Sequence, residues 1–507
     1  MLVNIIGDEA YGVYNNTYVI FTWVYAMTNV GMQPAIAKLV AELEEAGNPK
    51  DALKAFKISR TLLALVGLVA MLSLIIFAKP ISIATRNPRA TLSLMALAPT
   101  IAFTSVLVSY RGYFQGRSLI TPIGISQVVE QIVNVALSLL CAYLLLSVSF
   151  EAGVAGATVG TSIGALIALL YIMYIYRSRR YYVIPKSEQL AERRHSTKYL
   201  LRKVIKYGMP ITISTGLANF GAVIDATNVR SRLQAIGYVQ KNVDLMAGIL
   251  GKYQTLINVP IVFTTAIGTI MLPAIARSVV NRDKVAIRDK TRLALKLGFV
   301  ITIPSAMGLT VLSESVYKAL YGINTPGHML MTYGAFITVL IGMIQIQTTV
   351  LQSLNRFYAC LWTLVIGLIV KIGINYVLIG IPSINIYGAI IGGYVGYGIT
   401  FLLNVILLKK SIKKKIGYFS MLMGPIAASS LMGVVIYYVN KYGLYILRGM
   451  SASRKVYALI TFMAVIIGVV VYAYGLILTG VITKKEIKEV SPRLYNKVPG
   501  FIKRRMR

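Results

Sequence analysis

Thirteen long apolar stretches, separated by short polar or basic segments, constrain this chain of 507 residues more than any other feature. About 20 apolar residues cross a bilayer as a helix, whereas an open sheet would leave backbone groups unsatisfied in lipid. The stretches lie near residues 14–33, 61–78, 91–110, 122–148, 153–176, 208–228, 249–273, 297–313, 330–351, 358–381, 385–408, 418–438 and 456–482. A hydrophobic content of 56% and a charged content of 14% exclude a soluble, disordered or collagen-like chain. We therefore expect an all-α polytopic membrane protein.

The basic residues predict how the spans are oriented. Lys and Arg number 52 against 17 Asp and Glu, and 39 of the 52 fall on one set of alternating loops, with 11 on the other. The richer set comprises 38–60, 111–117, 177–206, 277–296, Arg356, 409–415 and 484–507. The positive-inside rule assigns this set, and with it the C-terminus, to the cytoplasm. The net charge of +35 then indicates contact with anionic membrane lipids rather than with nucleic acid.

An internal repeat divides the chain. PAIAKLV at 34–40 recurs as PAIARSV at 273–279, and Arg117 and Arg356 share that offset of 239 residues. EQIVN at 130–134 corresponds to KIGIN at 371–375, and GATVG at 156–160 to GAIIG at 388–392. The glycines spaced by four residues in 156–164 and 388–396 are expected to allow close helix packing. An even number of spans separates the copies, so the repeat is parallel. Two such lobes are typical of transporters that bind substrate between them near the bilayer midplane.

We expect five segments from this repeat. They are an N-terminal lobe (1–180), a basic cytoplasmic linker (181–206), a C-terminal lobe (207–410), two additional transmembrane helices (411–482) and a basic cytoplasmic tail (483–507). The second copy has a full helix near 208–228, but the first has only residues 2–6 in that place, so we expect the first helix to be largely missing. The cytoplasmic segments 35–57 and 274–292 resemble short amphipathic helices at the interface, or simply solvated faces.

Ionisable residues inside spans are the first site candidates, because each costs roughly 2.5–3.5 kcal/mol at mid-helix and needs a partner or water. Glu130 and its repeat mate Lys371 form either a charge pair or ion-coupling group in a central cavity, or two groups fixed locally by hydrogen bonds. Asp225 and Lys252 either pair near the outer mouth of the second lobe or reach toward the interface. Lys252, with Arg230 and Arg232 nearby in the expected outer loop, could attract an anionic head group.

Uncharged polar residues within spans add Asn134 and Asn375, again a repeat pair, as cavity candidates. Arg111, at the inner end of its span, is a weaker basic candidate because such residues usually extend to the interface. The sequence contains no GxSxG, HExxH or Walker motif and no Cys/His cluster with metal-ligand spacing. We therefore expect no enzyme activity, no metal and no cofactor.

Several motifs resemble one family across essentially the whole chain. They lie at 4–15 (NIIGDEAYGVYN), 31–42 (GMQPAIAKLVAE), 110–116 (YRGYFQG), 126–131 (SQVVEQ) and 258–260 (NVP). They are similar to bacterial polysaccharide-biosynthesis exporters of the SpoVB/MurJ kind, of Firmicute type, in the multidrug/oligosaccharidyl-lipid/polysaccharide flippase superfamily.

The resemblance implies a MATE-like fold of two pseudo-symmetric six-helix lobes plus two C-terminal helices, here with about 13 full spans. It also implies a location in the bacterial plasma membrane and alternating-access flipping of an undecaprenyl-diphosphate-linked glycan, foremost lipid II, from the inner to the outer leaflet. Coupling to Na⁺, H⁺ or the membrane potential would suit Glu130 or Asp225. The family's basic first-helix residues have no counterpart here, which leaves Lys252 and Lys371, then Arg111.

Three other functions stay open at this level. The chain could export another undecaprenyl-linked polysaccharide unit, or it could be a sporulation-specific paralogue. It could be a cation-coupled drug antiporter of the same superfamily. A membrane scaffold for division or sporulation would tolerate mutation of the cavity charges.

Overall fold

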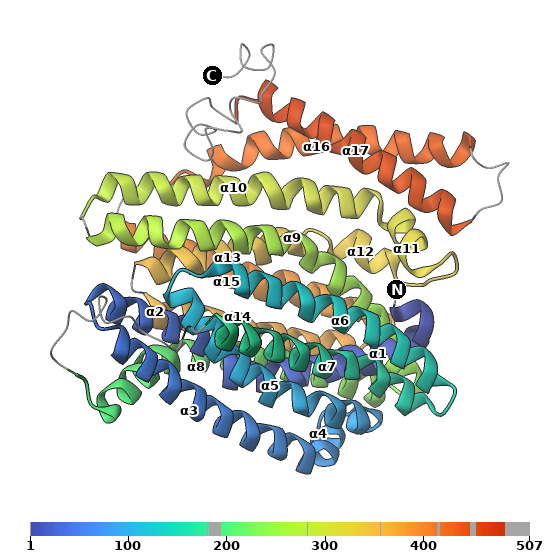
Figure 1. Ribbon diagram of the computed structural model, residues 1–507. Coiled ribbons are helices and arrows are strands. Elements are labelled where there is room, and N and C mark those ends of the chain that lie inside the picture. The colour runs from blue at the N-terminus through green and yellow to red at the C-terminus, as the bar shows by residue number, and fades with distance from the viewer. Residues whose placement is uncertain are drawn as a thin grey trace. The chain divides into compact units, whose positions relative to one another are not determined.

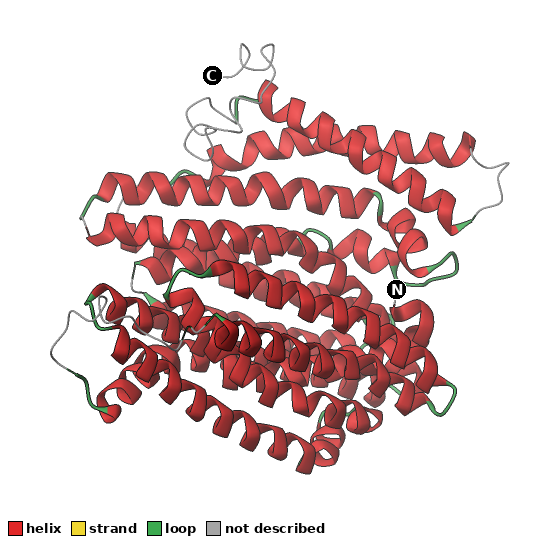
Figure 2. Ribbon diagram, viewed as in Figure 1, coloured by secondary structure: helices red, strands yellow, loops and turns green. Residues whose placement is uncertain are grey.

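The computed structural model describes residues 2–179, 181, 194–280, 282–354, 356–412, 416–446 and 453–481. The predicted cytoplasmic tail 483–507 and residues 182–193 of the predicted linker 181–206 lie outside these residues. Within them every regular element is a helix (Figure 2). The all-α expectation is thus confirmed.

The elements follow one another along the chain as labelled in Figure 1. They are α1 (Leu2–Tyr25), η1 (Ala26–Val30), α2 (Met32–Glu45), α3 (Pro49–Ile76), α4 (Ala78–Ala84), η2 (Pro88–Ala90), α5 (Thr91–Gly116), α6 (Ile120–Leu146), α7 (Phe150–Ser178), α8 (Thr197–Ala235), α9 (Gln240–Val280), α10 (Lys284–Val311), α11 (Ser313–Tyr321), α12 (His328–Gly334), α13 (Ile337–Ser353), α14 (Phe357–Ile379), α15 (Tyr387–Ile412), α16 (Tyr418–Ile446) and α17 (Arg454–Leu478).

Ten helices of the described residues are long and apolar enough to cross a membrane, and an eleventh span results if the bent pair α12 and α13 counts as one. The expected spans 14–33 and 208–228 correspond to α1 with η1 and to α8. These helices form as expected but fall short of that apolar standard because polar residues interrupt them. The count of about 13 spans stays a prediction.

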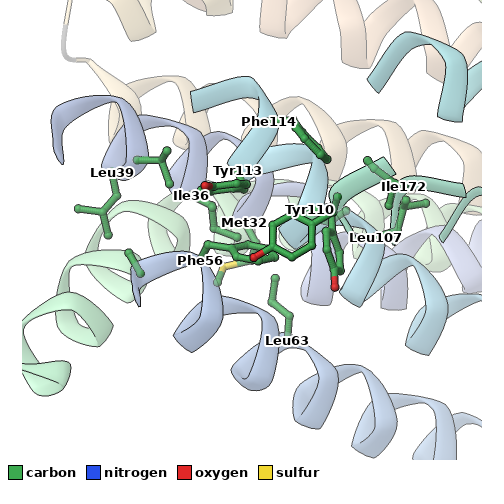
Figure 3. Packing of buried hydrophobic residues seen from close by; sticks show 14 of the residues in the cluster. Met32, Ile36, Leu39, Phe56, Leu63, Leu107, Tyr110, Tyr113, Phe114 and Ile172 are labelled. Atoms are coloured by element: carbon green, nitrogen blue, oxygen red, sulfur yellow. The ribbon is translucent and has the colours of Figure 1, made fainter. Parts of the chain in front are cut away.

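The chain divides into two compact units, Met1–Gly248 and Ile249–Arg507. The first contains α1 to α8. Its core joins α2, α3, α5 and α7 around an aromatic cluster (Figure 3), in which the Phe56 ring stacks on Tyr113 at 4.7 Å between centroids. Tyr110 meets the edge of Phe56 at 5.0 Å. This packing fixes α5, which carries Arg111, against α3.

The first three helices of this unit differ from the prediction made from the sequence. Segment 35–57 is not one short amphipathic helix, because α2 ends at Glu45 and α3 begins at Pro49. The Asn48 side chain accepts a hydrogen bond from the Asp51 N–H and caps α3, and Pro49 suits the first helical position. Residues 2–6 are separated from the rest of α1 by Gly7, whose φ of 79° is left-handed and non-helical.

Helices α6 and α7 pack closely through glycines. A methyl group on Gly164 would lie 2.7 Å from the Glu130 carbonyl oxygen, and one on Gly160 would lie 2.5 Å from that of Asn134. Only glycine permits this approach, and small residues at four-residue spacing are a common device for joining membrane helices. The expectation that 156–164 serves close helix packing is confirmed.

The second unit contains α10 to α17. One apolar cluster joins α10, α13 and α15, and another joins α10 and α11 to α16 and α17. Helices α16 and α17 lie side by side along α10 (Figure 1). Segment 274–292 is not a separate amphipathic helix: α9 runs to Val280 and α10 starts at Lys284, where Asp283 caps it by accepting from two backbone N–H groups.

Candidate functional site

A charge pair of the first unit joins α5 to α6. Arg111 Nη2 lies 2.7 Å from Glu130 Oε2, and Arg111 Nε donates to Ser126 Oγ over 3.0 Å. Ser126 and Glu130 are one helical turn apart on α6, so both face α5. Only 8% of Arg111 is exposed. The arrangement holds one cation and one anion in fixed positions within two helices that are long and apolar enough to cross a membrane.

This geometry makes Arg111 a stronger site candidate than the sequence indicated. The sequence placed it behind Lys252 and Lys371 and expected it to extend to the interface. It is instead buried and bonded to Glu130. Glu130 is therefore fixed by a local partner in its own unit, as one of the two readings of this residue had it.

A chain of polar groups continues from this pair. Asn134, one turn beyond Glu130, accepts hydrogen bonds at Oδ1 from Ser138 at 3.0 Å and from Thr161 of α7 at 3.1 Å. The Thr161 hydroxyl in turn bonds to the Tyr18 hydroxyl of α1. Four helices, α1, α5, α6 and α7, thus contribute polar groups to one connected region of the first unit.

Helix α1 adds a feature that the sequence reasoning missed, a row of aromatic rings spaced by three and four residues. Neighbouring ring centroids lie between 4.9 and 6.0 Å apart; the members are Tyr11, Tyr14, Tyr18, Phe21 and Tyr25. Tyr25 lies within electrostatic range of Arg111 and Glu130. The spacing alone predicts this stripe, since positions three and four apart share a helix face. Its tyrosines offer an apolar ring face and a polar hydroxyl edge next to the charge pair.

A second buried ion network lies where α1, η2, α8 and α9 meet within the first unit. Arg230 Nη1 lies 2.6 Å from Asp244 Oδ1, and Arg230 is 1% exposed. Arg89 Nη1 contacts Glu9 Oε1 at 2.6 Å and Asp244 Oδ2 at 3.6 Å. Arg230 also donates to the Gly12 carbonyl at 3.2 Å. These contacts tie four elements together.

The expected placement of Arg230 in an outer loop is wrong. α8 continues through Arg230 and ends at Ala235, so the side chain points into the protein and is bound by Asp244. Glycines allow the close approach: a methyl group on Gly12 would overlap the Asp244 carbonyl oxygen, and one on Gly248 would overlap that of Asp8. Removing either partner of a buried pair leaves an uncompensated charge, so this network is structural.

The second unit holds the remaining basic candidates. Lys371 of α14 places Nζ 5.2 Å from the ring centroid of Tyr397 on α15. Asn375, one turn later, is fully buried and lies against Gly392. Lys252 of α9 is fully buried, with Nζ 5.1 Å from the Tyr321 ring centroid. Each lysine therefore sits over an aromatic face, a favourable place for a desolvated cation.

Asp225 lies on α8 in the first unit and is 8% exposed. Its expected pairing with Lys252 joins the two units and stays a prediction. In the part of the chain that the structure describes, no group of three or more His, Cys, Asp or Glu side chains is arranged to hold a metal ion. The roles of the seven candidates in transport also stay predictions.

Comparison with known proteins identifies the family. The model of the polysaccharide biosynthesis protein family matches residues 1–279. Stage V sporulation protein B of Bacillus subtilis is 25% identical over 413 residues, 81% of this chain and 79% of that protein. Lipid II flippase MurJ of Bacillus subtilis is 24% identical over 421 residues, 78% of this chain and 75% of that protein.

Solved structures share the fold. An inward-facing multidrug resistance MATE family transporter matches with a TM-score of 0.66 and 14% identity, over 82% of this chain and 94% of its own. The lipid II flippase MurJ in an inward closed conformation matches with a TM-score of 0.59 and 14% identity, over 92% of this chain and 96% of its own. The MATE-like fold is thus confirmed, whereas the arrangement of the lobes stays a prediction.

Proposed function

The chain belongs to the polysaccharide biosynthesis protein family, and from this premise we propose that it is a flippase of the bacterial plasma membrane. It moves a lipid-linked glycan precursor from the inner to the outer leaflet by alternating access. The substrate is an undecaprenyl-diphosphate-linked glycan, foremost lipid II. A transporter rather than an enzyme is consistent with relatives named as a flippase and with neighbours in fold named as transporters.

The observation that carries the proposal is the connected polar region around Arg111 and Glu130 in the first unit. Charged groups inside spans are costly and usually face a water-filled cavity or one another. Here the pair lies one helical turn from Asn134, which accepts a hydrogen bond from Thr161, and Thr161 bonds in turn to Tyr18. A polar path of this kind replaces water around a hydrophilic head group while the lipid tail stays in the bilayer.

The aromatic row of α1 supports a glycan as the cargo. Sugar rings have apolar faces and polar edges, and tyrosines present a matching flat face and hydroxyl. Tyr14, Tyr18 and Tyr25 are partly exposed, so their rings are not consumed entirely by packing. The row begins near the Arg89–Glu9 pair and ends near the Arg111–Glu130 pair, so it follows the length of α1.

The membrane potential supplies a direction. A diphosphate head group carrying about two negative charges gains roughly 4–5 kcal/mol per 100 mV on moving outward, before any protein charge moves. Coupling to Na⁺ or H⁺ through Glu130 or Asp225 would add to this. Glu130 is better placed than Asp225, because a cation that binds the Glu130 carboxylate would separate it from Arg111.

Complementation of a bacterium depleted of its lipid II flippase tests the proposal. We expect the chain to restore growth and to lower the accumulated lipid II, and we expect Glu130→Gln and Lys371→Gln to fail although they reach the membrane. Lys409→Gln, at the exposed end of α15, is the matched control and should complement. Normal growth of both cavity variants would contradict the assigned roles.

Other substrates are outcomes of the same experiment. If the chain reaches the membrane and does not complement, export of another undecaprenyl-linked unit becomes the leading function; the similarity to stage V sporulation protein B favours sporulation as the condition to examine. A deletion strain that becomes sensitive to cationic dyes, without build-up of a glycan precursor, would indicate a drug antiporter instead.

A further inference from the structure

A cavity of about 830 Å³ lies within the second unit, between α10, α16 and the end of α17. Its walls differ in character. Helix α10 supplies Lys290, Arg292 and Lys296 together with Asp289, and the opposite side supplies the hydroxyl groups of Ser420 and Thr479. The Asp289 carboxylate lies 2.7 Å from Arg288, which does not line the cavity, so the charge facing the space is mainly positive.

The basic wall follows from the periodicity of α10. Residues 286, 289, 290, 293 and 296 repeat every three or four positions and therefore share one face of the helix. Lys290 Nζ donates to Ser278 Oγ over 2.8 Å, and Arg292 Nη2 donates to Ser420 Oγ over 3.4 Å. These two hydrogen bonds orient the Lys290 and Arg292 side chains.

Apolar side chains also line the cavity, among them Leu293, Met421, Met423 and Val481. Met423 is 50% exposed. A chain that spans the membrane exposes such residues to lipid tails. The cavity thus offers cations and hydroxyls for a phosphate, next to an apolar surface for acyl chains.

We propose that this cavity binds the phosphate-bearing head group of an anionic glycerophospholipid. The combination of cationic and apolar lining residues favours a lipid over a soluble anion, because a free phosphate has no apolar part to contact the apolar residues. The basic segment 277–296 belongs to the loops predicted to be cytoplasmic, which places the lipid in the inner leaflet. The inference concerns a resident lipid of α10, α16 and α17 and does not depend on which glycan the protein moves.

Native mass spectrometry of the purified full chain tests the site. Micelles contain phosphatidylglycerol or, as the neutral reference, phosphatidylcholine. The triple variant Lys290→Gln, Arg292→Gln, Lys296→Gln should bind phosphatidylglycerol more weakly by about fivefold for each cation removed. The control triple variant Lys284→Gln, Lys409→Gln, Lys410→Gln removes the same charge from exposed positions outside the cavity and should keep the affinity.

Two further measurements keep the test decisive. If the triple variant does not fold, Lys296→Gln alone should still lower the affinity, whereas Lys296→Arg should retain it. Competition with inorganic phosphate or with undecaprenyl phosphate identifies the source of the phosphate group. Equal losses in both triple variants, retained binding in the cavity variant, or displacement of phosphatidylglycerol by undecaprenyl phosphate at equal concentration would each overturn the proposal.

Discussion

The paired helices α6 and α7 of the first unit and α14 and α15 of the second have the same packing and opposite chemistry. Gly164 lies against Glu130 in one, and Gly396 lies against Lys371 in the other. One turn along, Gly160 meets Asn134, and Gly392 meets Asn375. The same glycines thus face the same repeat positions, although one position holds an anion and its counterpart a cation.

The difference lies in how each charge is satisfied. Glu130 has an ionic partner, Arg111, on a third helix. Lys371 lies over the Tyr397 ring of the helix with which its own helix is paired. An ion pair can be opened and re-formed by a charged ligand, whereas the contact of a cation with a ring involves no second charge. The repeat has therefore kept the contacts that hold the helices and changed the charge at this position.

The largest effect expected from this comparison concerns the glycines. Gly160→Ala should cost at least about 3 kcal/mol, because the added methyl group overlaps the backbone nitrogen of Ser138, which cannot move without the helix. Gly392→Ala should cost less, about 1–2 kcal/mol, because it meets chiefly the side-chain oxygen of Asn375. Thermal unfolding in detergent and the yield of monodisperse protein measure both.

Glycines in open positions are the controls for these variants. Gly124 of α6 and Gly373 of α14 have no atom within 4 Å of an added methyl group. Alanine there should be neutral or slightly stabilising, since alanine is the better helix former. Equal losses at Gly160 and Gly392 would contradict the argument that a backbone obstacle costs more than a side-chain obstacle.

The second-largest loss of stability is expected when the Arg111–Glu130 ion pair is broken. Glu130→Gln should destabilise the protein by about 2–3 kcal/mol, less than a fully buried pair, because it strands the Arg111 guanidinium. The double variant Arg111→Gln, Glu130→Gln should recover most of that stability but no transport. The four proteins form a double-mutant cycle, with unfolding temperature and cellular lipid II as its two readouts. Additive losses of stability would show that the pair is not coupled.

Lys371 in the second region should behave differently. Lys371→Gln should reduce transport strongly and change stability by only about 0.5–1 kcal/mol, the size of a cation–π contact. Tyr397→Phe keeps the ring and should preserve both properties, and Tyr397→Leu should lower stability by the same small amount as Lys371→Gln. A stability loss for Lys371→Gln as large as that for Glu130→Gln would remove the distinction between the two regions.

These regions also show what the sequence could predict. The equivalence of Glu130 with Lys371, and the close packing of the glycine stripes, followed from spacing alone, because a repeat of residues carries a repeat of helix contacts. The partner of Glu130 did not follow, because it depends on how α5 is rotated against α6. That rotation depends on contacts between distant parts of the chain, such as those of Tyr110 and Tyr113 on α5 with Phe56 on α3.

Other differences between prediction and structure could have been foreseen from the local sequence. Asn48 before Pro49 and Asp283 before Lys284 are helix-start patterns, and they explain why segments 35–57 and 274–292 each contain a helix boundary. Arg230 was assigned to a loop because its neighbours are polar, although its pairing with Asp244 keeps α8 regular to Ala235. Polarity at a helix end was thus mistaken for the end of the helix.

The smallest loss of stability is expected at an exposed ion pair, which serves as the reference for the buried pair of Arg111 and Glu130. Lys318 Nζ donates to Glu314 Oε1 over 2.6 Å on α11, outside the spans, and this hydrogen bond lowers the pKa of Glu314. Glu314 is 58% exposed in its side chain, so Glu314→Gln should cost no more than about 0.5 kcal/mol at pH 7. The matched control is Glu45→Gln, another exposed glutamate outside the spans.

The pH dependence of that small cost identifies its source. Because the folded pKa of Glu314 lies below the ordinary glutamate value of about 4.3, the ionised pair stabilises the protein above that value. The stabilisation is lost as the pH falls through the lowered pKa, so the difference in unfolding temperature between the wild type and Glu314→Gln should vanish as the solution is acidified. A difference that persists unchanged in acid would arise from packing, and the exposed pair could then no longer serve as the electrostatic reference for Arg111 and Glu130.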